Sequence, residues 1–177
     1  MNSLLGAFRQ SFEGVRYRHR VSTTGDRIAA FLYDDLFTLA HSEKLVARVS
    51  AATEVVNTLN RVKGREGRRG DWTFGQLVTV DSARVEAGYL VHRGPVATLR
   101  IGAEMKVVGT KQIAQIDRVM NDLLSQATTF RRTTRAALAV GIVAVNFAEK
   151  YTSYEGRRSF TASYPTSRDA PEIVARL

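Results

Sequence analysis

The sequence predicts an α/β protein in which a central mixed β-sheet is flanked by helices, all within a single domain. Three observations lead to this prediction. Apolar residues recur at helical spacing in residues 1–60 and again in residues 111–132. A β-branched and aliphatic stretch covers Val96 to Val108, and a near-continuous apolar run covers Ala136 to Phe147. A strand, a helix and a second buried strand form a β-α-β unit, which favours parallel strands joined by a right-handed crossover.

Length and composition fit one globular domain. The chain has 177 residues, of which 44% are hydrophobic and 24% charged, so it can bury a core. It contains no cysteine, which excludes thiol nucleophiles and cysteine-ligated metal sites, and its three histidines have no close metal-ligand spacing. The longest apolar run is too short for a membrane span, and the N-terminus lacks the pattern of a secretory leader. We therefore expect a cytoplasmic protein with no membrane partner.

The charge balance points to an anionic partner. The formal net charge is +9, and arginine outnumbers lysine among the 26 basic residues. The planar arginine fork suits bidentate contacts with phosphate, so we expect nucleic acid as the partner. An acidic partner protein or an anionic surface would account for the same excess of charge.

Two basic segments are the candidate contacts with nucleic acid. One is R-Y-R-H-R at residues 16–20, and the other is the glycine-rich stretch R-V-K-G-R-E-G-R-R-G at residues 61–70, which is predicted to be a loop. Solvated connectors have the same composition, and no G-K-[ST] follows to make a P-loop. The candidate phosphate-binding residues are Arg16, Arg18, Arg61, Lys63, Arg65, Arg68 and Arg69.

Residues 1–60 are predicted to be a helical N-terminal part. A short amphipathic helix is expected from Leu4 to Val15, and a second helix starts at Thr24 or Asp26 and ends near His41. Ser42 is the predicted N-cap of a third helix that continues to about Asn60. Glu43 and Glu54 lie on this third helix, where a solvated role is the simpler interpretation.

Residues 71–147 are predicted to form the sheet and its crossover helix. Three antiparallel strands are expected, at Trp72 to Val80, Arg84 to His92 and Val96 to Val108. A long amphipathic helix follows from Lys111 to Arg132. Residues 148–177 form a C-terminal extension, with an edge ribbon from Tyr151 and a short terminal helix after Asp169.

The third of these strands carries the charges of chemical interest. Side chains alternate along a strand, so Glu104 and Lys106 share one face, while Ala103, Met105 and Val107 lie on the other. A carboxylate and an ammonium side by side are either a mutually satisfied ion pair or a metal-binding acid beside a catalytic lysine.

A metal site needs a second acid near Glu104. Antiparallel pairing of the second and third strands would bring Glu86 close to it. Carboxylate oxygens suit Mg²⁺, which supports phosphodiester hydrolysis by activating water and neutralising charge. Glu86, Glu104 and the backbone carbonyl of Met105 are the predicted metal ligands, and Lys106 would orient the attacking water. Mn²⁺ is the alternative metal.

This order of elements resembles the PD-(D/E)xK phosphodiesterase superfamily over Ser42 to Phe147. Glu104-Met105-Lys106 stands as the (D/E)xK element, Val85-Glu86 takes the place of Pro-Asp, and Gln126-Ala-Thr-Thr-Phe130 is similar to the Q-x-x-x-Y of some branches. The proline of the Pro-Asp motif is absent before Glu86, and the first acid is glutamate instead of aspartate, so Asp71 and Asp81 are alternatives for that acid.

The resemblance implies a restriction-endonuclease-like fold and a Mg²⁺-dependent DNA endonuclease acting in restriction, phage defence or repair, as a homodimer or within a larger defence complex. The catalytic residues that it implies are Glu86, Glu104, Lys106 and Gln126. The alternative is a nucleic-acid-binding or assembly module of the same fold without catalysis.

Overall fold

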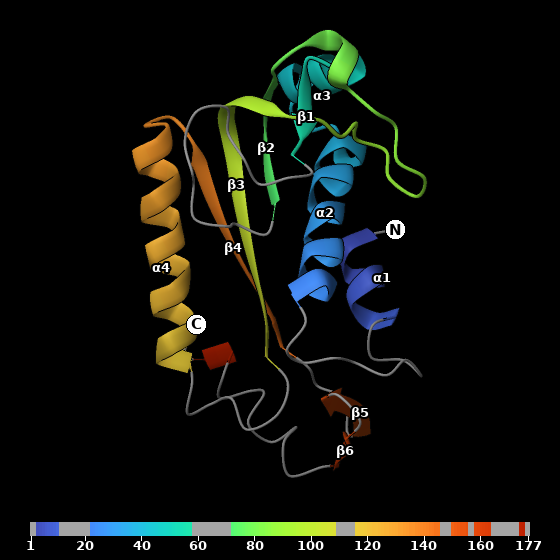
Figure 1. Ribbon diagram of the computed structural model, residues 1–177, viewed down its shortest axis with the longest axis vertical. Helices are drawn as coiled ribbons and strands as arrows, with labels where there is room; N and C mark the ends of the chain where they lie inside the picture. The colour runs from blue at the N-terminus through green and yellow to red at the C-terminus, as the bar shows by residue number, and fades with distance from the viewer. Residues whose placement is uncertain are drawn as a thin grey trace.

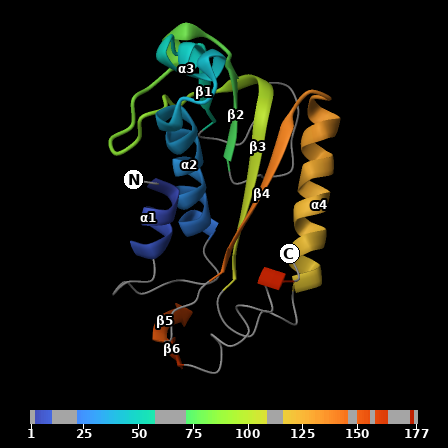
Figure 2. The same ribbon diagram turned by 180° about the vertical axis from the view of Figure 1, so that it is seen from behind.

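The computed structural model describes residues 3–10, 22–57, 72–108, 116–145, 150–155, 158–163 and 174–175, and it has an α/β fold in three layers (Figure 1). Helices α1 (Ser3–Gln10) and α2 (Ser22–Leu39) cover one face of a β-sheet, and α4 (Ile116–Thr133) covers the other (Figure 2). Helix α3 (Glu43–Ser50) lies at one end of the sheet. The predicted α/β class is confirmed. No helix in the described parts of the chain is long and apolar enough to span a membrane.

The sheet is mixed, as predicted. Its strands are β1 (Glu54–Val56), β2 (Trp72–Leu77), β3 (Val96–Val108) and β4 (Leu138–Val145), in the spatial order β1-β2-β3-β4. Strand β2 is antiparallel to both of its neighbours, whereas β4 is parallel to β3 and reached through α4. Strands β5 (Lys150–Glu155) and β6 (Arg158–Ser163) pair as a separate ribbon, which confirms the ribbon expected from Tyr151.

The third predicted helix begins where expected but ends early. The Ser42 side chain accepts a hydrogen bond from the Leu45 N–H, which confirms it as the N-cap. The predicted continuation to Asn60 is wrong. Ala52 adopts a left-handed φ of 52°, and the Thr53 N–H bonds back to the Arg48 carbonyl, a geometry that closes the helix C-terminus. The β-branched residues that follow then form β1, which places Glu54 on a strand.

The predicted strand at Arg84–His92 is also wrong. These residues form an irregular excursion between β2 and β3, closed by reciprocal backbone hydrogen bonds between Arg84 and Arg93 (2.7 and 2.8 Å). Gly88 has a φ of 89° within the excursion, a conformation that no extended strand contains. The backbone N–H groups of Leu90 and Val91 donate to the carboxylate of Asp34 on α2 instead of to a neighbouring strand.

The apolar stretches Val96 to Val108 and Ala136 to Phe147 both predict internal strands; β3 is internal to the sheet, but β4 is not. Within the described residues, β4 pairs only with β3 and so lies at an edge, and its Leu138 is 60% exposed. The apolar run arises because both faces of β4 are covered by helices, and not because β4 has a neighbouring strand on each side. Val143 and Val145 pack with Ile116 at the start of α4, while the opposite face packs against α1 and α2. An edge strand sandwiched between helices therefore has the composition of an internal one.

Replacing Asp34 with asparagine is expected to remove a pH-dependent loss of folding stability that ionisation of the Asp34 carboxyl group causes in the wild type. Asp34 is 3% exposed, and burial raises the pKa of its carboxyl group despite the two backbone donors. Because the folded pKa is above the unfolded value of about 3.9, the wild type loses stability as pH rises through the interval between them. Asparagine retains an acceptor oxygen and does not ionise. Urea unfolding across pH should therefore show the variant gaining stability relative to wild type up to the folded pKa; a pH-independent difference would contradict this.

Candidate active site

Glu104 and Lys106 form an ion pair on β3. Lys106 Nζ lies 2.8 Å from Glu104 Oε1, and the exposed fractions of the two side chains are 30% for lysine and 11% for glutamate. Ala103 and Met105, which alternate with them, pack into the apolar clusters on the α2 side of the sheet. The predicted sharing of one face is confirmed, and that face is the one covered by α4.

A β-bulge determines which face of the sheet receives these charges. Phe74 of β2 pairs with Ile101, but Gly75 pairs with Leu99, so Arg100 is an extra residue on β3. As a result, Leu99 and Gly102 both face Phe130 of α4. If Arg100 instead took part in regular pairing, with no bulge, side-chain alternation counted from Leu99 would direct Glu104 into the apolar layer beneath α2.

Helix α4 carries Gln126 over the same part of the sheet. Phe130 lies against Gly102, where an added Cβ would be 2.4 Å from the ring, and Leu123 lies at Gly141, the β4 partner of Glu104. Gln126 is between these two helical positions and is 4% exposed. The structure thus brings Glu104, Lys106 and Gln126 of the predicted catalytic set to one side of the sheet.

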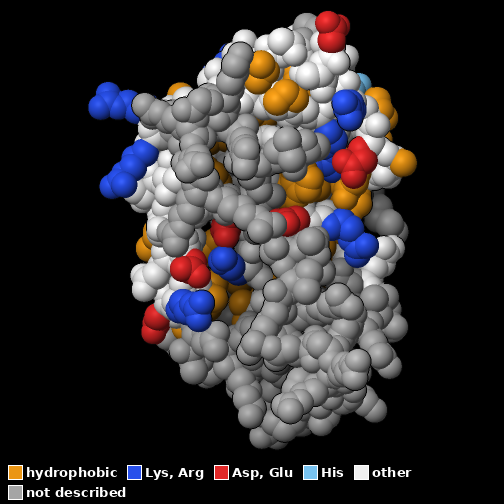
Figure 3. All heavy atoms as spheres, viewed as in Figure 1, with side chains coloured by type: hydrophobic (Ala, Val, Ile, Leu, Met, Phe, Trp, Pro, Cys, Tyr) orange, Lys and Arg blue, Asp and Glu red, His pale blue; other side chains and the backbone are white. Residues whose placement is uncertain are grey.

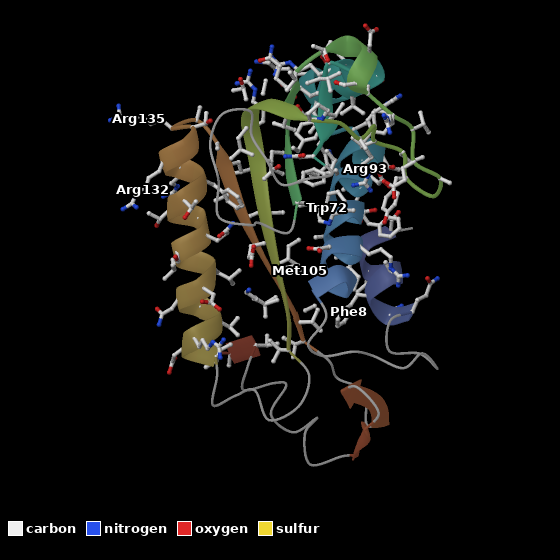
Figure 4. All side chains as sticks on the ribbon, viewed as in Figure 1. Phe8, Trp72, Arg93, Met105, Arg132 and Arg135 are labelled. Carbon is white, nitrogen blue, oxygen red and sulfur yellow. The ribbon has the colours of Figure 1, made fainter. Side chains whose placement is uncertain are left out.

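Glu86 is the predicted catalytic residue and metal ligand that the structure does not bring there. Its carboxylate lies 3.4 Å from the guanidinium of Arg93, and its side chain is 52% exposed. The Arg93 guanidinium in turn stacks over Trp72 (4.4 Å) and Tyr89 (3.9 Å) on the α2 side of the sheet (Figure 4). The prediction that Glu86 lies beside Glu104 is wrong, because its segment packs against α2 through the Tyr89–Phe31 stack and forms no strand beside β3.

This buried arginine was not anticipated from the sequence. Arg93 is 2% exposed, and burial lowers the pKa of its guanidinium while the charge of Glu86 acts in the opposite direction. A lone arginine next to a Gly-Pro turn carries no sequence signal for such burial, and only the aromatic residues around it could have suggested cation–π stacking. Its role is to hold the excursion onto the α2 side.

Two alternatives were open for the second acid. Asp81 lies in the 3-10 turn η1 (Val80–Ser82), beyond the β2 residue that pairs with Val96. Val96 is roughly 26 Å from Glu104 along β3 at about 3.3 Å per residue, so Asp81 is remote from the ion pair. Asp71 lies outside the described residues. In the sequence it directly precedes Trp72, which pairs with Ala103, the neighbour of Glu104.

Glu54, also considered in the sequence, forms ion pairs that have a structural role. It is buried on β1, where its carboxylate pairs with Arg48 of α3 and with the bulge residue Arg100 at 3.3 Å. It therefore links α3 to the sheet and is not available to a site on the α4 side.

Thr73 is a site residue that the sequence did not single out. It pairs with Gly102 on the face opposite to Trp72, so it lies on the same face as Glu104. Its side chain is buried, and its hydroxyl has no hydrogen-bond partner in the described parts of the chain. The alternation of Trp72-Thr73-Phe74 indicates that Thr73 lies on the opposite face of the strand from the two aromatic residues. The sequence does not tell which face of the sheet carries Glu104, so it did not mark Thr73 as a site residue.

The described residues include the predicted metal ligands but none of the predicted phosphate-binding residues. Among the described residues there is no group of three or more histidine, aspartate or glutamate side chains placed to hold a metal. Glu104 and the adjacent backbone of Met105 are together on β3. The predicted phosphate-binding residues all lie outside the described residues; they are Arg16, Arg18, Arg61, Lys63, Arg65, Arg68 and Arg69.

Comparisons of the chain with protein-family models, with curated proteins and with solved structures found no match. The assignment of function therefore depends on the residues of the site and their geometry.

Proposed function

We propose that this protein is a Mg²⁺-dependent DNA endonuclease of the PD-(D/E)xK type with a restriction-endonuclease-like fold. The observation that carries the proposal is the Glu104–Lys106 pair on the internal strand β3, with Lys106 Nζ 2.8 Å from the carboxylate and Gln126 on the helix above. A partly exposed carboxylate beside an ammonium is the arrangement that the E-x-K motif needs for metal-assisted hydrolysis.

The order of the elements supports the same proposal. Three antiparallel strands, β1 to β3, are followed by α4 and a parallel β4, and the E-x-K triplet is on the third strand of this series. The strands differ from those predicted, because β1 replaces the end of a helix and β2 becomes the middle strand. The acid nearest to the start of the middle strand in the sequence is then Asp71, which directly precedes β2.

The donor set suits the proposed metal. Glu104 offers a hard carboxylate oxygen, and Met105 next to it offers a backbone carbonyl, which are the ligand types that Mg²⁺ and Mn²⁺ prefer. We assign Asp71 as the second carboxylate ligand. When bound, the metal supplies neutralisation of the phosphodiester charge and activation of water.

The chain supplies the remaining chemistry. The Lys106 ammonium has three donors, which can orient the attacking water and stabilise the negative charge that develops on the phosphate. The Gln126 amide can both donate and accept, so it can fix the orientation of the water or of a phosphate oxygen. Both groups are held before substrate arrives, Lys106 by Glu104 and Gln126 by the packing of α4 on β3 and β4.

Cleavage assays with paired glutamate variants test the proposal. Wild-type protein is expected to cleave plasmid, linear duplex or single-stranded DNA in Mg²⁺ or Mn²⁺ and to be inactive in EDTA. Glu104→Gln should lose cleavage, since an amide is a poor metal ligand. Glu86→Gln is the matched control, because it makes the same chemical change on the opposite side of the sheet, and it should cleave at the wild-type rate.

The same assay identifies the second acid. Asp71→Asn should be inactive and Asp81→Asn should be fully active, since Asp81 is remote from Glu104. Full activity of Glu104→Gln would exclude catalysis at this pair, and loss of activity in Glu86→Gln would contradict its placement outside the site.

The second candidate function is a DNA-binding or assembly module without catalysis. It is favoured by the short Glu104–Lys106 contact itself, because a mutually satisfied ion pair is also a common structural feature. Binding of DNA without cleavage in either metal would support this function and not the nuclease.

A further inference from the structure

Three arginines gather at one end of α4. Arg131 and Arg132 are in the last turn of the helix, and Arg135 is in the turn that leads to β4. All three side chains are exposed. Figure 4 shows Arg132 and Arg135 projecting outward from this end of the helix, and Figure 3 shows basic side chains extending from the corresponding edge of the surface.

Within the described residues, these three cations have no acidic partner, whereas four basic residues on and around the sheet do. Arg48, Arg93, Arg100 and Lys106 each lie within 4 Å of a carboxylate. Within the parts of the chain that the structure describes, none of the three arginines has a carboxylate at that distance. Their charge is therefore available to an anion from outside.

The arginine cluster is fixed to the sheet rather than carried on a loose segment. Phe130, directly before Arg131, is 5% exposed and packs closely on Gly102 of β3. After the helix, the Thr134 N–H bonds to the Phe130 carbonyl (3.0 Å) and the Ala137 N–H bonds to the Thr134 carbonyl (2.9 Å). These contacts hold the backbone on both sides of the arginines, which reduces the entropy lost on binding.

We propose that Arg131, Arg132 and Arg135 form a contact surface for the phosphate backbone of duplex DNA. The proposal rests on the proposed function and adds a DNA-contact surface to it. Favourable interaction with the helix dipole explains a cation within the last turn, but Arg135 lies beyond the helix, where that effect has faded. Gly102, which packs under Phe130 at this end of α4, is two residues from Glu104 on β3. The helix end that carries the cluster and the proposed active site are therefore on the same side of the sheet.

Replacement of the three arginines by glutamine tests the surface. Glutamine retains good helix propensity while removing the charge. Arg118→Gln is the matched control, since Arg118 is exposed on the same helix near its other end. Binding of a fluorescently labelled duplex is measured by anisotropy in EDTA over a range of salt concentrations, with melting temperatures to confirm folding.

The triple variant is expected to bind about tenfold or more weakly at moderate salt, and its log–log salt slope should fall by about two to three, near 0.9 for each lost phosphate contact. The control should match the wild type. The proposed contact surface would be wrong if the triple variant bound DNA with the wild-type affinity and salt slope, or if the wild type bound no DNA.

The two proposals fail separately in these experiments. Loss of cleavage in Glu104→Gln together with normal binding by the triple variant would retain the nuclease and remove the surface. Weakened binding by the triple variant, in a wild-type protein that cleaves no DNA in Mg²⁺ or Mn²⁺, would retain the surface and remove the nuclease.

Discussion

Replacement of Lys106 by methionine is expected to lower Mg²⁺-dependent DNA cleavage by about 10²–10³-fold, the usual cost of removing one preorganised charge-stabilising donor. Methionine keeps most of the length and apolar character of the lysine stem, so the packing beneath α4 is preserved. The ammonium 2.8 Å from Glu104 is removed. Initial cleavage rates of purified variant and wild type, in Mg²⁺ and in Mn²⁺, measure the effect.

Thermal melts separate this outcome from loss of a structural ion pair. The substitution leaves the Glu104 carboxylate, 11% exposed, without its ammonium; because the Lys106 side chain is 30% exposed, the cost is expected to be below the roughly 3–5 kcal/mol of a fully buried pair. If Glu104 binds metal, added Mg²⁺ should restore part of that stability in Lys106→Met, because a ligand stabilises the state that binds it. The double variant Glu104→Gln/Lys106→Met should show no such restoration. A folded Lys106→Met protein that cleaves at the wild-type rate would remove the nuclease assignment from this site.

Replacement of Gly75 by alanine is expected to destabilise the fold by about 3 kcal/mol or more, at the upper end of overpacking effects. A Cβ at this position would lie 2.1 Å from the Thr98 carbonyl oxygen and 2.9 Å from Val96 Cγ1. The first of these contacts is with backbone, which cannot rotate away. Urea unfolding measures the loss of stability.

The control is Gly6→Ala in α1, where no atom of the described residues outside the local helix backbone and the adjacent residues lies within 4 Å of the added Cβ. It should leave stability unchanged or raise it by up to about 1 kcal/mol through helix propensity. Since Gly75 also adjoins the bulge at Arg100, a folded Gly75→Ala variant should show altered placement of Glu104 and reduced cleavage. Wild-type stability in Gly75→Ala would contradict the close approach of β2 to β3.

The sequence determined the features that depend on local pattern. The helical period of residues 116–133 and the β-branched stretch of Val96–Val108 specify α4 and β3, and the order of strand, helix and strand specifies a parallel β4. Side-chain alternation placed Glu104 and Lys106 on one face, and the hydroxyl of Ser42 capped α3.

Tertiary structure decided what local pattern leaves open. The helix-period residues after Ser50 and the strand-like residues 84–92 adopt other conformations, because a left-handed Ala52 ends α3 and the carboxylate of Asp34 takes the backbone donors of the excursion. Asp34 is 56 residues from Leu90, so no local window of sequence contains that partner, and the left-handed position at residue 52 is an alanine rather than the glycine that would mark a helix end. The extra residue at Arg100 directs the charged pair toward α4, and Glu86 is drawn to Arg93 on the other side of the sheet. The position of Glu86 thus depended on the conformation of residues 84–92, and the face that receives the charged pair depended on strand register, which a one-residue bulge reverses without changing the sequence pattern.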